Sequence, residues 1–466
     1  MKMIKNKTYD VIVIGGGASG TALFYVLSKY STVKSIAIIE KYGSFGQVNS
    51  KGNNNSQTLH IGDIETNYSL GKASIVKPAA LMVSKYTYSL WKKKANQIIF
   101  PVSKMVLAVG KKEVAQLEKR YLEFRTLYSD LKRLEYDEIA KIEPAITEGR
   151  NQNEPILALY TENGYAVDYE ALAKSFVEQV ISKKISDRNI DIHLATKVIH
   201  IIKNENGYRI ETTKGIFIAK TVVVNTDAYS LYFAKSLGYG KEFSLIPVAG
   251  NFYFSKQMLN GKVYTMQDKK LPFAAVHGDP DIHVPNKTRW GPTAKMSPVL
   301  ESRNFSTIFD YFKSASLFRF ATIKSFMIIL SDMTRFTFLL KNTLYDIPIV
   351  GKYFFVKNVQ KIVPTIHARD LKKAKGFGGM RLQRVDTNTH ELQLGEGKII
   401  GDNIIFNMTP SPGASVCLFN GMRDAEKIIE FLGASYQFDK CAMENDFGGG
   451  CFDNDKKVIS ENAYWS

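Results

Sequence analysis

The stretch YDVIVIGGGASGTALFYVLSKY, Tyr9–Tyr30, decides the fold class. Val11–Ile14 is an apolar run typical of a buried strand, and apolar side chains recur at helical spacing through about Lys29. Three glycines between them have the spacing G-x-G-x-x-G: Gly15, Gly17 and Gly20. The first permits a tight turn, the second lets a pyrophosphate approach the backbone, and the third lets helix and strand pack closely. The stretch therefore predicts a dinucleotide bound at a helix N-terminus.

A second apolar strand, SIAIIEK, ends in Glu40, twenty residues after Gly20. An acid at this place accepts hydrogen bonds from the ribose hydroxyls of a bound dinucleotide. The predicted cofactor contacts in this unit are Gly15, Gly17, Ala18, Ser19, Gly20, Glu40 and Lys41. The motif alone leaves both NAD and FAD open.

The middle of the chain favours FAD. A helix is predicted from Asp168, followed by alternating strands with Asn-Gly and Lys-Gly turns and a last strand, TVVV, that runs into Asn225. This order resembles flavoproteins of the D-amino-acid-oxidase and glutathione-reductase type, which implies FAD contacts at Val198 and Asn225. No second glycine triplet follows a strand, so we expect no separate NAD module. The predicted fold is α/β, with a Rossmann-type FAD-binding domain and a second, α+β substrate domain.

Length and composition bound the remaining choices. At 466 residues two domains are expected, and a net charge of +17 admits nucleic acid, anionic lipid or acidic metabolites as partners. Three cysteines without a CxxC pair predict neither a disulfide framework nor a metal site. The N-terminus lacks the pattern of a secretory signal, so we expect a cytoplasmic protein. No apolar run approaches the roughly 20 residues of a membrane span, so any membrane contact should be peripheral.

A polar stretch, NNNSQTLHIGDIETNYS, Asn53–Ser69, has almost no hydrophobic periodicity. Its core, SQTLHIGDIETNY, resembles a signature of the malate:quinone oxidoreductases. Further blocks resemble this family in the same order: IPVAGNFYF, KVYTMQDKKLPFAAVHGDPD, TRWGPTAKMSPVLE, GFGGMRLQRVD and FNMTPSPGASVCLFN. The resemblance runs from about Tyr9 to Gly433. It departs from the family at Leu382, where proline is expected, and over 302–343, which matches no family block.

The resemblance implies an FAD enzyme that oxidises (S)-malate to oxaloacetate by hydride transfer to flavin N5 and passes the electrons to membrane quinone. A related flavin-linked hydroxy-acid oxidiser, such as L-2-hydroxyglutarate dehydrogenase, is the nearest alternative. An FAD protein that modifies tRNA is a remote one, permitted by the basic charge. Because the lysines are scattered, we expect no nucleic-acid partner.

Oxidation of a hydroxy acid needs a base near the hydroxyl, and histidine suits this role near neutral pH. His277, in AVHGDP, is the favoured base, and His60, in the polar stretch, is the alternative. The other five histidines are expected to be structural: His193, His200, His283, His367 and His390.

The substrate carboxylates call for cations, and bidentate arginine contacts also give orientation. Arg381, in GGMRLQ, is the leading candidate for substrate binding and catalysis. Weaker substrate-binding candidates are Lys77, Arg289 and Gln57. Ser56, Gln57 and Thr58 are expected to face the flavin, and Asp63 and Glu65 to hold the surrounding geometry. A helix starting at Gly413, Ala414 and Ser415 is expected to direct its N–H groups to the flavin pyrimidine.

A quinone acceptor implies contact with a bilayer. Within Lys313–Lys341, rich in Phe, Leu and Ile, the side chains of Lys313, Lys324 and Arg335 fall in one arc at 100° per residue. This pattern is typical of an interfacial helix or helix pair. We therefore expect peripheral docking through 302–343 on the inner face of the cytoplasmic membrane.

The predicted domain boundaries interleave. The FAD-binding domain takes 1–80, 150–245 and 366–435, and the substrate domain takes 81–149 and 246–365. The end of the chain, 436–466, has three adjacent glycines and no apolar period, so it is expected to be a flexible tail.

Overall fold

The computed structural model describes residues 7–182, 187–267, 275–393, 396–409 and 412–447. Its first sheet has the strand order β21-β22-β11-β1-β2-β8, extended at β11 by the hairpin β10-β9. Its strands are β1 (Lys7–Ile14), β2 (Ser35–Ile39), β8 (Asn189–His193), β9 (Val198–Asn204), β10 (Gly207–Thr212), β11 (Gly215–Val224), β21 (Gly397–Gly401) and β22 (Ile404–Met408). Strands β22, β11, β1, β2 and β8 run parallel, as expected for a Rossmann-type sheet.

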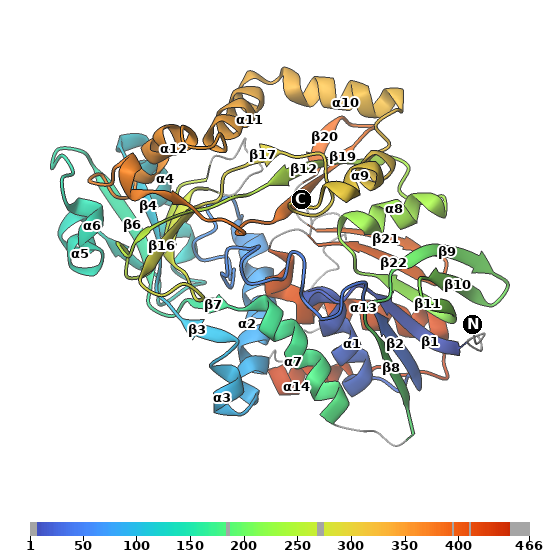
Figure 1. Ribbon diagram of the computed structural model, residues 1–466. Helices are drawn as coiled ribbons and strands as arrows, with labels where there is room; N and C mark the ends of the chain where they lie inside the picture. Colours follow the sequence, from blue (N-terminus) through green and yellow to red (C-terminus); the bar gives the residue numbers. More distant parts are fainter. Residues whose placement is uncertain (1–6, 183–186, 268–274, 394–395, 410–411, 448–466) are drawn as a thin grey trace.

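A second large sheet lies beside the first (Figure 1) and has the order β18-β13-β16-β15-β14-β4-β6-β5. Its strands are β4 (Lys104–Val109), β5 (Lys132–Leu134), β6 (Ile156–Thr161), β13 (Tyr253–Lys256), β14 (Lys262–Thr265), β15 (His277–Pro280), β16 (Lys287–Gly291) and β18 (Lys372–Lys373). A four-stranded sheet, β17-β12-β19-β20, lies below α10 and α11 in Figure 1. This sheet and one small pair contain β12 (Phe243–Ala249), β17 (Lys295–Met296), β19 (Met380–Asp386), β20 (Glu391–Gln393), and β3 (Ile99–Pro101) with β7 (Tyr165–Val167).

The helices cover the outer faces of these sheets. They are α1 (Ala18–Tyr30), α2 (Leu70–Ser89), α3 (Lys92–Ala95), α4 (Lys111–Phe124), α5 (Tyr136–Ile142), α6 (Pro144–Thr147), α7 (Tyr169–Ser182), α8 (Ala228–Ser236), α9 (Ile308–Ala315), α10 (Phe320–Ser331), α11 (Met333–Tyr345), α12 (Gly351–Gln360), α13 (Cys417–Leu432) and α14 (Lys440–Phe447), with short 3-10 turns η1 (Phe305–Thr307), η2 (Ala368–Asp370) and η3 (Gly413–Val416). Helix α1 is buried on nearly all sides because α7 and α13 pack against it. That burial explains why its sequence is apolar beyond a single stripe.

The predicted strand–turn–helix unit is confirmed, with β1, α1 and β2 at the expected places. The antiparallel excursion β9-β10-β11 is confirmed as well, with Asn206-Gly207 and Lys214-Gly215 at its two turns. Strand β11 returns to the middle of the parallel sheet and delivers Asn225 beside Gly15, whose backbone N–H lies at the end of β2.

Three boundary predictions need correction. Strand β6 pairs with β4 and β5 in the second sheet, although its residues were assigned to the FAD-binding domain. Strand β19 pairs along β12 and also lies outside the parallel sheet. Residues 436–447 are not a free tail, because α14 buries Met443 and Phe447 against α1 and α2. The rest of the predicted tail, 448–466, lies outside the described residues.

The apolar segment 302–343 is not one helix. It folds into η1, α9, α10 and α11, with a left-handed residue at Ser316 and a break at Asp332, whose carboxylate caps α11. The arc of Lys313, Lys324 and Arg335 is therefore divided among three helices. No single helix in the described ranges is long and apolar enough to span a bilayer. The helix pair Phe305–Ala315 and Phe320–Ser331, which is bent by 104°, has the length and composition of a span only when its two members are taken together.

Candidate active site

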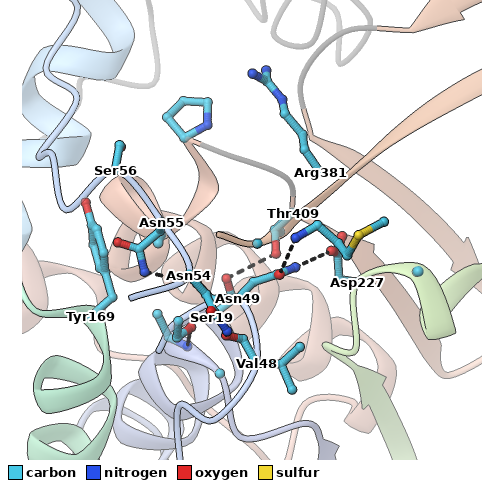
Figure 2. Close-up of a pocket in the computed structure, with 18 of the residues that line it drawn as sticks. Ser19, Val48, Asn49, Asn54, Asn55, Ser56, Tyr169, Asp227, Arg381 and Thr409 are labelled. Atoms are coloured by element: carbon cyan, nitrogen blue, oxygen red, sulfur yellow. Dashed lines mark hydrogen bonds between the residues drawn. The ribbon is translucent and has the colours of Figure 1, made fainter. Parts of the chain in front are cut away.

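A cavity of about 380 Å³ runs between the carboxyl ends of the parallel strands and the second sheet. Figure 2 shows part of its lining, with Ser19 and Thr409 near the first sheet and Arg381 set apart from the hydrogen-bonded cluster around Asn49. Every family-like block identified in the sequence contributes lining residues. Examples are Ser56, Phe252, His277, Glu301, Arg381 and Ala414.

The glycine-rich turn forms one end of this cavity, and the space around each position explains why glycine occupies it. Gly15 has a φ of 107°, and a Cβ there would lie 2.3 Å from the carbonyl oxygen of Asn225. A Cβ on Gly20 would lie 1.9 Å from the Gly15 oxygen, so Gly20 serves helix–strand packing and does not line the cavity. At Gly17 a Cβ meets only the Ser50 hydroxyl, and any longer side chain there would fill the cavity. The N-cap of α1, Gly17, has no side chain to cap the helix, and among the first-turn N–H groups that of Ala18 donates to the Ser50 hydroxyl at 3.0 Å. A helix N-terminus without a capping N-cap side chain can receive a pyrophosphate.

Glu40 lies at the same end, as predicted. Its carboxylate accepts hydrogen bonds from the backbone N–H groups of Gly16 at 2.6 Å and Tyr42 at 2.8 Å. Burial raises the pKa of Glu40, and these two donors oppose the increase. Lys41, Val198 and Asn225 line the cavity nearby, and the amide nitrogen of Asn225 is buried without a hydrogen-bond partner. A donor left unpaired in this wall suits a polar cofactor such as FAD.

The polar stretch Asn53–Ser69 crosses the middle of the cavity. Its residues Gln57 to Leu59 pair with β7, and the Tyr169 hydroxyl donates to the Thr58 carbonyl oxygen at 2.7 Å. The Ser415 hydroxyl accepts from the backbone N–H of His60 at 3.1 Å, so this side chain holds the stretch. Ser56, Thr58, His60 and Glu65 then line the cavity, as expected.

His60 has an asymmetric environment. Its Nδ1 lies 2.6 Å from Glu65 Oε1, and Glu65 also accepts from the Gly62 N–H at 2.8 Å. Burial opposes ionisation of Glu65, but His60 holds its pKa down at about 2, so the carboxylate is charged. A charged acceptor at Nδ1 fixes the proton there and leaves Nε2 as an acceptor, 3.3 Å from the cavity-lining Ser56 hydroxyl.

His277 also lines the cavity, but acceptors face both of its ring nitrogens. Nδ1 lies 3.2 Å from the Ala275 carbonyl oxygen, and Nε2 lies 3.6 Å from Asp279 Oδ1. Its ring stacks on Tyr264 with centroids 4.5 Å apart. Burial lowers the pKa of His277 to about 4, and nearby Lys262 and Arg289 lower it further. Because Nε2 is buried beside Asp279 without a hydrogen-bond partner, it is not exposed to a substrate in the cavity, which argues against the favoured role of His277 as base.

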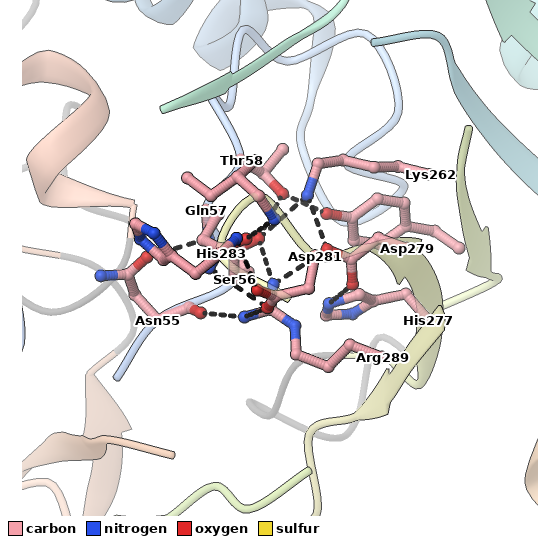
Figure 3. A network of polar contacts seen from close by, with 12 residues as sticks. Asn55, Ser56, Gln57, Thr58, Lys262, His277, Asp279, Asp281, His283 and Arg289 are labelled. Atoms are coloured by element: carbon pink, nitrogen blue, oxygen red, sulfur yellow. Dashed lines mark hydrogen bonds and ion pairs between the residues drawn. The ribbon is translucent and has the colours of Figure 1, made fainter. Parts of the chain in front are cut away.

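Behind His277 lies a buried ionic cluster (Figure 3), made of Lys262, Arg289, Asp279 and Asp281. Asp279 accepts from Lys262 at 2.9 Å and from Arg289 at 2.8 Å. Burial opposes ionisation of Asp279, but the two cations hold its pKa down at about 2. Arg289 and Lys262 also donate to the backbone carbonyl of Ser56 at 3.0 Å each, so the cluster supports the polar stretch from behind.

Arg381 is a positively charged side chain that lines the cavity. It projects from β19 into the cavity, and no carboxylate among the described residues lies within ion-pair distance of it. Its Nε is buried without a hydrogen-bond partner. Burial lowers the pKa of Arg381, but a guanidinium remains charged. The arrangement is suited to an anionic substrate.

Besides Gly20, four predicted contacts need correction. Lys77 points away from the cavity and donates to the Leu127 carbonyl oxygen at 2.7 Å. Arg289 is fully buried in the ionic cluster and cannot reach a ligand. Gln57 has a φ of 55°, which turns its amide toward the Gly52 carbonyl at 2.8 Å. Gly413 begins η3 but faces Glu396 and Thr409 instead of the cavity, whereas Ala414 and Ser415 do line it.

The cavity also contains residues that the sequence argument missed. Tyr264 donates or accepts at 2.5 Å with the Thr58 hydroxyl, and Asp227 accepts from Asn49 at 3.0 Å (Figure 2). Burial raises the pKa of Asp227 to about 7. Tyr264 belonged to a quoted family block and could have been found there. Asp227, two residues after Asn225, gave no signal of its own. None of the five histidines expected to be structural lines the cavity.

Comparison with known proteins gives consistent results. The family model for malate:quinone oxidoreductase (Mqo) matches residues 7–430. A probable malate:quinone oxidoreductase of Campylobacter jejuni is 42% identical over 452 residues, covering 95% of this chain and 100% of its own. A malate:quinone oxidoreductase of Helicobacter pylori strain J99 is 39% identical over 445 residues, covering 93% and 96%.

Solved structures support the fold. The L-alpha-glycerophosphate oxidase of Mycoplasma pneumoniae with FAD bound has a TM-score of 0.62 at 18% identity, covering 91% of this chain and 95% of its own. The glycine oxidase of Geobacillus kaustophilus has a TM-score of 0.60 at 17% identity, covering 93% and 97%. These likenesses confirm the predicted FAD-dependent oxidoreductase fold. With the family match over nearly the whole length, this chain belongs to the malate:quinone oxidoreductase family.

Proposed function

We propose that this protein oxidises (S)-malate to oxaloacetate with FAD held in the cavity and that membrane quinone takes up the electrons. The family match over residues 7–430 supports the reaction, and the one observation that carries the substrate class is Arg381, a cavity cation without an ion-pair partner among the described residues. A guanidinium in this state can bind a substrate carboxylate in a bidentate manner.

The cavity lining suits FAD. The glycine turn and the first turn of α1 would hold the pyrophosphate, Glu40 the ribose, and Ser56, Thr58 and the start of η3 the flavin side. When bound, FAD supplies the acceptor for the hydride that leaves the substrate carbon. The protein has to orient the malate, exclude water and remove the hydroxyl proton.

We assign removal of that proton to His60. Its Nε2 faces the cavity as an acceptor because Glu65 holds the ring proton on Nδ1. The charge of Glu65 also stabilises the imidazolium that forms when His60 takes the hydroxyl proton. Arg381 orients the substrate carboxylate. His277 forms part of the wall with Tyr264 and supports the polar stretch through the ionic cluster.

Anaerobic mixing with substrate tests the assignment. L-malate should bleach the flavin absorbance of the purified protein, and L-2-hydroxyglutarate, one methylene longer, should bleach it far more slowly. Bleaching by L-2-hydroxyglutarate alone would replace malate with the longer hydroxy acid. Replacing Arg381 by Lys should raise the malate concentration for half-maximal bleaching about tenfold or more, because a bidentate contact is lost. The isomeric D-malate serves as the stereochemical control.

Docking on a bilayer would bring the quinone to this protein. Helices α9 to α12 form a surface, here called the apolar platform, whose side chains are exposed although apolar. Its members are Phe305, Phe309, Phe318, Phe320, Ile323, Met327, Ile328, Met333, Phe336, Leu340, Ile347, Ile349, Val350, Tyr353 and Phe354. Exposure reaches 88% at Phe318, and residues 305–357 carry seven lysines and arginines against three aspartates. An exposed apolar surface with cationic residues suits an anionic lipid surface, here the inner face of the cytoplasmic membrane.

Flotation with vesicles tests this surface. The protein should bind phosphatidylglycerol vesicles more strongly than phosphatidylcholine vesicles, and the double replacement Phe318→Ser and Phe320→Ser should weaken both. Trp91→Ser is the matched control, because Trp91 is exposed next to α3, far from α10 (Figure 1). Equal loss of binding in the control would remove the platform from the proposal.

A further inference from the structure

The segment 300–310 passes over the end of the cavity that holds Glu40. Leu300 and Glu301 line the cavity there, together with Lys41 and Tyr229. Because Glu40 marks the expected place of the ribose, this is the adenosine end of the FAD site. Residues of a distant segment therefore close the site over a part of the cofactor that takes no part in hydride transfer.

Glu301 fixes the segment in this place. Its carboxylate is almost fully buried and forms an ion pair with Lys41 through Oε1. Its Oε2 accepts from the Tyr42 hydroxyl at 2.6 Å and from the Asn304 amide at 3.0 Å. The Lys41 ammonium lies 4.6 Å from the centre of the Tyr229 ring. A buried carboxylate with three donors is a strong link between two segments 260 residues apart.

Two further contacts bind the same segment to the cavity walls. The Tyr229 hydroxyl donates to Asp310 in the first turn of α9 at 3.0 Å. Arg303 donates to the side-chain oxygen of Asn54, at the start of the polar stretch, at 2.8 Å. The segment thus joins the residues that follow β2, helix α8 and the start of the polar stretch across the cavity end, and none of these contacts is a backbone pairing of the parallel sheet.

The outer side of the segment belongs to the apolar platform. Phe305 is 75% exposed and Phe309 is 71% exposed, and they lie four residues and one helical turn apart. The same short segment therefore carries buried residues that line the cavity, Leu300 and Glu301, and exposed phenylalanines that face away from the protein interior. Because the segment is short, holding Phe305 and Phe309 in place also restrains Leu300 and Glu301.

We propose that residues 300–310 form a clasp that retains FAD by closing over its adenosine end, locked by Glu301 on Lys41 and Tyr42, and that docking of Phe305 and Phe309 on lipid holds the clasp closed. The inference rests on the proposed function, which supplies the FAD and the lipid surface. A ligand that binds the closed form more tightly than the open form shifts the equilibrium toward closure, so lipid should slow the loss of FAD.

The test measures release of FAD from the full-length holoprotein as the rise in flavin fluorescence after dilution. Glu301→Gln should speed release about tenfold or more, since it removes a buried ionic link, and Tyr42→Phe should speed it less. Glu162→Gln, which removes an exposed ion pair with Lys132, is the matched control and should not change it. Phosphatidylglycerol vesicles should slow release from the wild type and leave a Phe305→Ser and Phe309→Ser variant unaffected.

Hydrogen exchange gives a second measurement that does not require FAD to leave. Glu301→Gln should speed amide exchange in 300–310 of the holoprotein and leave β1 and α1 unchanged. Unchanged release and exchange in both Glu301→Gln and Tyr42→Phe would overturn the clasp. Vesicles that bind the protein without slowing release would overturn the link to lipid. A purified protein without FAD would instead overturn the proposed function, which separates the two failures.

Discussion

Two histidines face the same cavity from different walls, and their surroundings make them different chemical groups. His60 has a carboxylate at Nδ1, and its Nε2 lies 3.3 Å from the hydroxyl of the cavity-lining Ser56. His277 has a backbone carbonyl at Nδ1, its Nε2 is buried beside Asp279 without a hydrogen-bond partner, and two buried cations lie nearby. The surroundings of His60 prepare its ring to accept a proton, whereas those of His277 keep its ring neutral within the cavity wall. The comparison shows that residue type and a place in the cavity wall do not define a base, because the accepting ring nitrogen must also face the cavity.

The sharpest way to break this comparison is His60→Asn. It should lower the rate of flavin bleaching by L-malate by about 10²- to 10⁴-fold, the usual contribution of a general base. FAD absorbance and the thermal unfolding temperature should stay close to those of the wild type. If bleaching kept its speed, His60 would lose the role and His277 would regain it.

Asp279→Asn tests the other wall. Removing this charge leaves Lys262 and Arg289 buried with less compensation, so the free energy of unfolding should fall by about 3 kcal/mol. Chemical denaturation of the holoprotein measures the change. Glu118→Gln, which removes a partly exposed partner of Arg133, should change it by less than about 1 kcal/mol. A stability loss no larger than that of the control would contradict the importance of the cluster.

Glu65→Gln separates charge from position at His60. The amide oxygen can still accept the Nδ1 proton, but the charge that stabilises the imidazolium is gone. Bleaching by malate should slow about tenfold, less than for His60→Asn, because a charge-assisted hydrogen bond becomes a neutral one. Single-turnover absorbance measures this rate. A loss as large as that of His60→Asn would show that the carboxylate does more than support the ring.

The smallest predicted effect concerns acid stability. The pKa of His277 is about 4 in the folded protein against an ordinary 6.5, so below pH 6.5 the unfolded chain binds a proton that the folded chain does not. Folding stability should therefore fall as the pH falls, by about 1 kcal/mol from this residue between pH 6.5 and 5.5. His277→Asn should reduce that slope while malate bleaching stays within about tenfold of the wild type. An unchanged slope would refute the neutral-wall interpretation.

The parallel sheet and its cofactor turn could be predicted because their signals are local. Gly15, Gly17 and Gly20 have a fixed spacing, and β1, β2 and β11 are apolar along their buried lengths. The helix at Lys440–Phe447 escaped notice because a run of polar residues surrounds Met443 and Phe447, whose i, i+4 spacing is its only apolar signal. Lys313, Lys324 and Arg335 were placed on one helical arc because Asp332 was not recognised as the N-cap that starts a new helix, α11.

The residues of the candidate site were likewise predictable only in part. Arg381 and His60 were found because they stand in family-like blocks, and the structure places both in the cavity. Lys77 stands outside these blocks and Arg289 stands inside one of them, TRWGPTAKMSPVLE, and both were considered for their charge. The structure gives Lys77 a backbone carbonyl as its partner and gives Arg289 two carboxylates, so neither is available to a ligand.

The sequence alone determined that the chain contains a dinucleotide-binding turn and that blocks resembling one enzyme family follow it in order. Both signals could be read because each consists of residues close together along the chain. The tertiary structure decided which histidine turns its accepting nitrogen toward the cavity, that Arg381 lacks an ion-pair partner among the described residues, and which distant segment lines the Glu40 end of the cavity. These properties depend on what meets each side chain from distant segments, such as Glu301 on Lys41 or Lys262 and Arg289 on Asp279. Spacing along the chain does not record such encounters.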